Sequence, residues 1–218
     1  MTVFDKLYVT DAKYFGGDPD DLLVQFCERL DPGARVLDVG AGQGRHALFL
    51  ARRGHPVDCI EASRVAVAQI NECASKERLP VRAFPLEFEE YSPDVDFYPV
   101  ILLFGLIQEL PWDSIGTLVD RATAWTRAGS LVLATAFTTG DPEAPEISCT
   151  WRKIGKNSFL RDAGFVRTFL EPGEFKTLFE GWEPLHYWEG LGPEHRHGND
   201  PPHRHGRVEA VLRKGSRS

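Results

Sequence analysis

The sequence of 218 residues contains only four cysteines, and no two of them form a C-x-x-C pair. It therefore suggests neither a zinc knuckle nor a redox pair, and a reduced, cytoplasmic location is expected. No apolar run approaches the roughly 18 residues of a membrane span, and the first residues lack the apolar stretch of a signal peptide. Positive charge is in deficit, since the formal net charge is −7. Because binders of nucleic acid usually carry a basic face, nucleic acid is not expected as a partner. A membrane is not expected either, because the apolar runs are too short to span one.

The first two-thirds of the chain alternates between strand-like and helix-like apolar patterns. Apolar runs predict strands at residues 35–39, 56–60, 81–84, 100–104 and 130–137. Amphipathic periodicity predicts helices at residues 18–30, 44–53, 63–76 and 113–125. Asp18, Ser63 and Asp113 are the expected N-caps of three of these helices. Repeated β-α units imply an α/β fold, in which helices cover both faces of a mostly parallel sheet.

The last third of the chain has a different pattern. Residues 138–165 are polar, rich in Gly and Pro, and match no regular element. A short helix is predicted at residues 172–180, and two late strands are predicted at 182–188 and 207–213. The polar segment 189–206 joins these two strands. No linker divides the chain, so we expect one domain over residues 1–218.

The most informative motif follows the first predicted strand, where residues 38–45 read D-V-G-A-G-Q-G-R. Gly40, Gly42 and Gly44 allow positive φ and a close approach of the backbone to a ligand. The helix that follows directs its free N–H groups at this loop. A phosphate P-loop is excluded, because no G-x-x-x-x-G-K-S/T string occurs. A dinucleotide-dependent oxidoreductase is disfavoured, because its fingerprint needs a small residue where Arg45 stands. A tight turn without a ligand is the structural alternative.

The spacing D-x-G-x-G-x-G resembles motif I of the class I S-adenosylmethionine-dependent methyltransferases, and the resemblance covers residues 20–137. It implies a Rossmann-like, doubly wound, seven-stranded sheet in the order 3-2-1-4-5-7-6. It also implies S-adenosylmethionine as the cofactor, S-adenosylhomocysteine as the product and a small molecule as the methyl acceptor. Residues 18–137 would then form the cofactor-binding core, and 138–218 the acceptor side. Residues 1–17 are expected to be an N-terminal segment that could close over the cofactor.

The resemblance places cofactor contacts in loops at the carboxyl ends of the strands. Glu61 ends the second strand, where an acidic residue can accept hydrogen bonds from both ribose hydroxyls. Glu87 is expected at the adenine amino group, where the family prefers Asp, unless Leu86 takes that place. Phe104 lies either near the methionine part of the cofactor or in the core. The expected cofactor-binding set is Asp38, Gly40, Ala41, Gly42, Gly44, Arg45, Glu61, Ala62, Glu87, Phe88 and Phe104.

One position departs from the family pattern. The aspartate that commonly begins the fourth strand is absent, and Tyr98-Pro99 stands in its place.

Tyr14-Phe15, the short chain and its last segment look like the small tellurite-resistance and thiopurine methyltransferase-like group. That group methylates small, soft nucleophiles such as oxyanions or thiols. The resemblance implies that His195, Arg196 and Arg204 bind or activate the acceptor. The runner-up is a biosynthetic O- or N-methyltransferase of a secondary metabolite, and the alternative of another class is a non-catalytic protein that binds S-adenosylmethionine. A monomer or a homodimer is expected.

The segment 195–205 contains four histidines and two arginines and has three interpretations of its own. Arginine and histidine together suit an anion-binding or proton-handling site. The H-x-H pattern, which occurs twice, could chelate zinc or nickel. A solvated hairpin loop is the third interpretation. No metal is expected, because neither cysteine nor clustered carboxylates accompany the histidines in the sequence.

Overall fold

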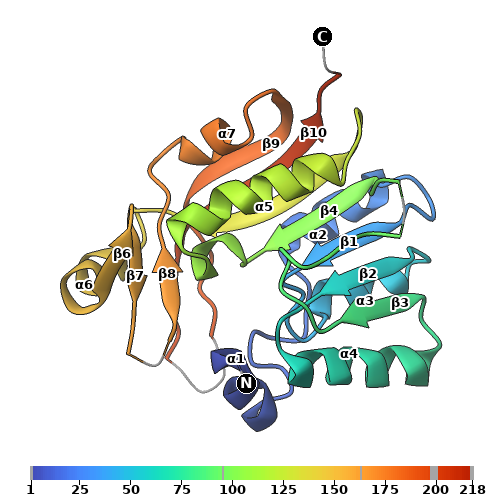
Figure 1. Cartoon of the computed structure of the whole chain (residues 1–218), viewed down its shortest axis with the longest axis horizontal. Helices are drawn as coiled ribbons and strands as arrows, with labels where there is room; N and C mark the ends of the chain where they lie inside the picture. Colours follow the sequence, from blue (N-terminus) through green and yellow to red (C-terminus); the bar gives the residue numbers. More distant parts are fainter. Residues whose placement is uncertain (1, 95, 163, 197–200, 217–218) are drawn as a thin grey trace.

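The computed structural model describes residues 2–94, 96–162, 164–196 and 201–216, and it is drawn in Figure 1. These residues form a seven-stranded sheet in the order β3-β2-β1-β4-β5-β10-β9. Its strands are β1 (Val36–Val39), β2 (Val57–Ile60), β3 (Val81–Phe84), β4 (Val100–Phe104), β5 (Leu131–Phe137), β9 (Trp182–Leu191) and β10 (Gly206–Lys214). The first five are parallel, whereas β10 is antiparallel to both β5 and β9. Numbered among themselves, these strands follow the predicted order 3-2-1-4-5-7-6, so the predicted fold is confirmed.

Two apolar clusters cover the two faces of this sheet. Successive strand residues point to opposite faces, so Val36 of β1 joins one cluster and Leu37 joins the other. The cluster around Leu37 packs against α5 (Trp112–Ala124) and α7 (Glu174–Leu178), in front of the sheet in Figure 1. The cluster around Val36 packs against α2 (Asp21–Phe26), the short 3-10 turn η1 (Cys27–Arg29), α3 (Arg45–Ala51) and α4 (Arg64–Glu77). None of the described helices is long and apolar enough to cross a membrane.

The N-cap predictions were right at one helix and wrong at two. The Ser63 hydroxyl accepts a hydrogen bond from the Ala66 N–H and caps α4, as predicted. The first predicted helix starts later than expected, because Asp20 and not Asp18 is its N-cap. Asp20 accepts from the Leu22 N–H, and its other oxygen pairs with Arg207 of β10. That long-range ion pair fixes Asp20, and no local pattern could have indicated it.

The helix α5 begins one residue before the predicted cap Asp113. Its N-cap is Pro111, which offers no side-chain acceptor, and Asp113 lies inside the first turn. The Trp112 N–H donates instead to the Ser158 hydroxyl at 3.0 Å. A tertiary partner therefore satisfies a helix terminus that usually needs a local cap, while Asp113 complements the helix dipole from the first turn.

Residues 138–170, most of which matched no pattern, hold α6 (Ala144–Thr150) and a second, three-stranded sheet. This small antiparallel sheet consists of β6 (Arg152–Gly155), β7 (Ser158–Leu160) and β8 (Val166–Thr168). A third apolar cluster, which includes Phe137, Phe159 and Phe169, holds it against the carboxyl end of β5. The Thr168 hydroxyl also donates to the carbonyl of Leu110, which precedes α5. The small sheet therefore stands beside the edge of the main sheet where a ligand is expected (Figure 1).

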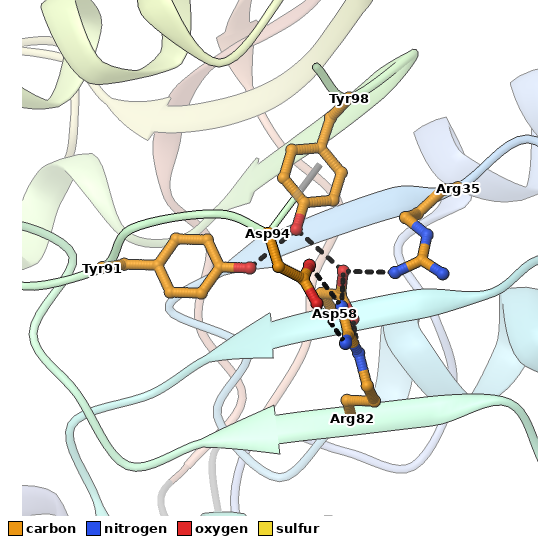
Figure 2. A network of polar contacts seen from close by, with 6 residues as sticks. All are labelled: Arg35, Asp58, Arg82, Tyr91, Asp94 and Tyr98. Atoms are coloured by element: carbon orange, nitrogen blue, oxygen red, sulfur yellow. Dashed lines mark hydrogen bonds and ion pairs between the residues drawn. The ribbon is translucent and has the colours of Figure 1, made fainter. Parts of the chain in front are cut away.

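A buried polar network joins the amino ends of four parallel strands, at the opposite edge of the main sheet (Figure 2). Asp58 of β2 accepts from the Tyr98 hydroxyl at 2.8 Å and from Arg82 of β3 at 2.7 and 3.0 Å. Arg35, just before β1, donates to the same carboxylate at 3.1 Å. Tyr98 is fully buried and also bonds the Tyr91 hydroxyl at 2.7 Å. The tyrosine that replaces the usual aspartate before β4 thus fastens β4 to β2.

Candidate functional site

The glycine loop between β1 and α3 has the backbone conformation that the motif predicts. Gly40, Gly42 and Gly44 have φ values of +70°, +52° and +82°. A Cβ on Gly40 would lie 2.9 Å from the Leu106 side chain, and one on Gly44 would lie 2.7 Å from Ile70. The glycines are therefore required by the turn itself, which brings bare backbone to the carboxyl edge of the sheet.

Glu61, at the carboxyl end of β2, is held in one orientation by that loop. Its Oε2 accepts from the Gly42 N–H and its Oε1 from the Ser63 N–H, both at 2.8 Å. The residue is 8% exposed. Burial raises the pKa of Glu61 above its usual value, although the two backbone N–H groups oppose that shift. Each carboxylate oxygen retains a further lone pair, so the group can accept two more hydrogen bonds from a ligand.

Glu87 reaches the same region, but its neighbour Phe88 does not face outward. Glu87 is exposed, and its negative charge contributes to the raised pKa of Glu61. Phe88 is 4% exposed and belongs to the core cluster around Leu37. The structure therefore brings the two predicted carboxylates together, and gives Phe88 the contacts of a core residue.

Asp38 lies beneath the glycine loop and is 1% exposed. The Ala47 N–H contacts its carboxyl group, but in the described part of the chain its Oδ2 has no hydrogen-bond partner. Burial and the negative charge of Glu61 raise the pKa of Asp38 to about 7. A buried carboxyl group with a pKa near neutral and an oxygen that lacks a partner is able to bind a cationic group of a ligand.

Phe104 and His46 stack against each other below the loop. Their ring centroids are 4.4 Å apart at an interplanar angle of 28°, and both residues are buried. Burial, with the positive charge of Arg45, lowers the pKa of His46 well below its usual value. His46 is therefore neutral at physiological pH. Phe104 was expected either near the methionine part of the cofactor or in the core, and its described contacts are those of a core residue.

The N-terminal helix α1 (Val3–Thr10), which no pattern predicted, covers the glycine loop. The Ser63 hydroxyl donates to Asp5 at 2.5 Å, and Gln69 of α4 donates to the carbonyl of Tyr8 at 2.9 Å. A Cβ on Gly42 would lie 3.3 Å from the Tyr8 hydroxyl. Figure 1 shows α1 beside the amino end of α4. The segment expected to close over the cofactor is therefore folded over the loop in this structure.

The rest of that segment is fastened to the loop by two long side chains. Gln43 donates to the carbonyl of Asp11 at 2.8 Å and accepts from the Tyr14 N–H at 2.9 Å. Arg45 donates to the carbonyl of Phe15 at 2.6 Å. The arginine that argued against a dinucleotide fold thus holds the N-terminal segment in place.

A half-buried ion pair, missed by sequence reasoning, joins the segment after β4 to the small sheet. Glu109 of the 3-10 turn η2 (Ile107–Glu109) pairs with Arg167 of β8, and their side chains are 18% and 21% exposed. Burial raises the pKa of Glu109, whereas the positive charge of Arg167 opposes that shift. The Arg167 guanidinium lies over the Phe137 ring, which in turn stacks on His205 at 4.0 Å. The position of Glu109 soon after β4 was the only feature of the sequence that could have indicated this ion pair.

The resemblance groups His195, Arg196 and Arg204 together, but the segment between β9 and β10 places the histidine and the two arginines on opposite sides. His195 and His203 face each other in an antiparallel bridge, with both N–H···O distances at 2.9 Å. Because alternate residues of paired strands point to opposite faces, Arg196 and Arg204 project away from the histidine side. Both arginines are exposed. His197, the remaining histidine of this segment, lies outside the described residues.

Comparisons with known proteins agree with this geometry. A family model described as "Tellurite resistance protein TehB" matches residues 8–204. Hemagglutinin 1 of Eikenella corrodens is 28% identical over 164 residues, which are 74% of this chain and 48% of that protein. A "Probable S-adenosyl-L-methionine-dependent methyltransferase TehB" of Haemophilus influenzae is 25% identical over 196 residues, which are 88% of this chain and 59% of that protein. The crystal structure of TehB from Haemophilus influenzae superposes with a TM-score of 0.72 at 23% identity, covering 97% of this chain and 65% of that one.

This chain thus spans only 48% and 59% of the length of these two curated relatives. The matched part nevertheless includes the glycine loop, Glu61 and most of residues 195–205, the histidine-rich segment between β9 and β10. The chain belongs to the TehB family, and its fold is that of the class I S-adenosylmethionine-dependent methyltransferases.

Proposed function

We propose that the protein is a methyltransferase that uses S-adenosylmethionine and acts on a small-molecule acceptor. The observation that carries this proposal is the hydrogen bond between the Glu61 carboxylate and the Gly42 N–H. It aligns a ribose-binding acid with a loop whose backbone can approach a ligand closely. The buried Asp38 carboxyl group, with its unsatisfied Oδ2, supplies a place for the ammonium group of the cofactor.

The residues of the chain bind and orient, and the cofactor brings the reactive group, an electrophilic methyl on a sulfonium. Glu61 would hold the ribose, and Glu87 the adenine amino group. The N-terminal segment, held by Gln43 and Arg45, would exclude water from the site. The protein's contribution to the in-line transfer is then alignment of the acceptor and removal of solvent.

The acceptor that we favour is a soft nucleophile, a chalcogen oxyanion or a thiol. The family model is named for tellurite resistance. An anionic acceptor is already deprotonated, so it needs positive charge more than a strong base. Arg196 and Arg204 would attract and orient it, with His195 on the opposite side of the same segment. Turnover on phenols or amines instead would support the biosynthetic O- or N-methyltransferase.

The pH dependence of cofactor binding should report on Asp38. Its pKa of about 7 in the free protein means that the carboxylate becomes protonated as the pH falls. Because a ligand ammonium prefers the carboxylate, the affinity for S-adenosylhomocysteine should rise with pH up to about 7. Below that value it should fall about tenfold for each pH unit. Calorimetric titrations at several pH values test this, and Asp38→Asn should flatten the profile. An Asp38→Asn profile as steep as that of the wild type would remove Asp38 from this role.

The two arginines of the histidine-rich segment should affect turnover and not cofactor binding. We expect Arg196→Ala combined with Arg204→Ala to lower kcat/KM for an oxyanion acceptor by about tenfold, because two charge donors are lost. The dissociation constant for S-adenosylhomocysteine should not change. Arg213→Ala, which removes an exposed arginine from the far end of β10, is the matched control. Unchanged turnover in the double variant would contradict the assignment of these two arginines to the acceptor.

The first experiment is a thermal shift with S-adenosylhomocysteine, with NAD as the control ligand. Saturation at about 100 times the dissociation constant adds roughly 2.7 kcal/mol to the free energy of unfolding, which is about 5–10 °C for a domain of this size. A shift with S-adenosylhomocysteine alone supports the cofactor. Turnover is then measured on tellurite, selenite, thiols and phenols. Binding without turnover on any acceptor would favour a non-catalytic protein, and no shift would contradict the cofactor assignment.

A further inference from the structure

Three histidine rings gather on one side of the segment between β9 and β10. The bridge between His195 and His203 puts these residues side by side, and His205 lies two positions further along the same face. Their ring centroids are 4.7, 4.9 and 5.1 Å apart. Each ring offers one nitrogen such that all three nitrogens lie within 4.8 Å of one another. We propose that His195, His203 and His205 form a binding site for a divalent transition-metal ion of the zinc type.

Each ring is held through its Nδ1 by an oxygen that accepts hydrogen bonds. The Nδ1 of His195 lies 3.1 Å from the carbonyl of Pro193, and that of His203 lies 3.0 Å from the carbonyl of Pro201. The Nδ1 of His205 lies 2.8 Å from Asp141 Oδ2. Carbonyl and carboxylate oxygens can only accept, so each Nδ1 carries the proton. In the neutral form of each ring the lone pair is therefore on Nε2, which is the nitrogen that would ligate the metal.

This arrangement is the one that metal-binding histidines usually have. A ligating imidazole commonly donates its other N–H to a carboxylate or a backbone carbonyl, which fixes the ring and raises its basicity. Asp141 is itself fixed, because it accepts from the backbone N–H groups of Glu143 and Gly206 at 2.8 and 3.0 Å. His205 is 5% exposed and stacks on Phe137. His205 is thus held rigidly, and His195 and His203 are positioned beside it by the hydrogen bonds between their backbones.

The donor set points to the class of metal. Three imidazole nitrogens suit zinc, nickel or copper, whereas magnesium and calcium prefer oxygen. Tetrahedral zinc with three protein ligands keeps one position for solvent or a small anion. Its ligand nitrogens would be about 3.3 Å apart, so the three rings would have to move closer together than the 4.8 Å within which their nitrogens now lie. Asp141 and Glu143 form a second set with His205. We assign Asp141 to orienting the His205 ring, because its carboxylate already holds Nδ1.

Calorimetry with the full chain tests the site directly. The protein is stripped with a chelator, dialysed and titrated with Zn²⁺ alone, with no cofactor or acceptor present. We expect one ion per chain. His203→Gln, which changes a half-buried side chain, should weaken binding by more than the roughly 10–100-fold typical of losing only an orienting partner. Asp141→Asn should weaken it within that range, because the amide cannot hold the ring as a carboxylate does.

Two controls keep the result interpretable. Glu194→Gln removes an exposed carboxylate from the same segment and should leave the affinity for Zn²⁺ unchanged. Far-UV circular dichroism and melting temperature check that each variant is folded. With Co²⁺ in place of Zn²⁺, the wild type should give the visible spectrum of a tetrahedral nitrogen site, and His203→Gln should not. Stoichiometry well below one ion per chain, or equal affinities for the wild type and His203→Gln, would overturn the proposal. Neither readout depends on methyltransferase activity, so the two proposals fail separately.

Discussion

Replacing Glu61 with alanine is expected to weaken the binding of S-adenosylhomocysteine by about 100-fold. A carboxylate that accepts two ribose hydroxyls makes two charge-assisted hydrogen bonds, each worth about 1.5–3 kcal/mol. Loss of both corresponds to at least two decades in the dissociation constant. The substitution also frees the N–H groups of Gly42 and Ser63, which the carboxylate now satisfies. The glycine loop should therefore be less well ordered in the variant.

Isothermal titration calorimetry with S-adenosylhomocysteine measures this effect, at a temperature well below the melting point of the variant. Glu89→Ala is the matched control, because Glu89 is an exposed glutamate from the loop after β3. It should bind with wild-type affinity. If Glu61→Ala bound the ligand as tightly as Glu89→Ala does, the assignment of the ribose site would have to be abandoned.

Asp58→Ala should cost about 3 kcal/mol of folding stability and lower the melting temperature by about 6–12 °C. Removal of one member of a buried ion pair is strongly destabilising. Here the fully buried Tyr98 hydroxyl and the Arg82 guanidinium both lose an acceptor. The effect is placed at the lower end of the range for buried pairs, because Arg82 is 44% exposed.

Asp94→Ala provides a test within the same network, because Asp94 also pairs with Arg82, as Figure 2 shows. Its side chain is 63% exposed, so its removal should cost much less stability than the removal of Asp58. Denaturant titration of both variants gives the comparison. Equal losses for Asp58→Ala and Asp94→Ala would mean that burial does not set the strength of this network.

The same network predicts the direction of acid sensitivity. Burial raises the pKa of Asp58, but hydrogen bonds from Arg82 and Tyr98 outweigh that effect, so the pKa lies below its usual value. A lowered pKa stabilises the folded state above the unfolded pKa, and that stability is lost as the pH falls. The difference in stability between the wild type and Asp58→Ala should therefore shrink in acid.

The main sheet and the glycine loop could be predicted because their signals are local. Buried strands such as Val100–Phe104 are continuous apolar runs, and glycine spacing at 40, 42 and 44 encodes a backbone conformation directly. Connection rules then leave few topologies for repeated β-α units. The exact order of the seven strands, in contrast, was predicted only from the resemblance to the methyltransferase family.

The unpredicted features depend on partners that are far apart in the sequence. Strands β6 to β8 are short and lack the continuous apolar run that marks strands such as β1 and β2. They are held by contacts with Phe137 and Leu110. The half-buried pair of Glu109 and Arg167 spans 58 residues. The absence of a nearby carboxylate argued against a metal in the histidine-rich segment. The structure brings Asp141 to His205 from 64 residues away.

The contacts that hold the N-terminal segment differ in how much they demand of its sequence. Gln69, Gln43 and Arg45 reach the carbonyls of residues 8, 11 and 15. A carbonyl belongs to every residue, so these three acceptors persist whatever side chains the segment carries. Asp5, which bonds Ser63, is an exception. Most of the polar contacts that hold the segment are therefore encoded in the body of the domain, and the sequence of the segment itself is constrained mainly by its buried side chains, such as Tyr8.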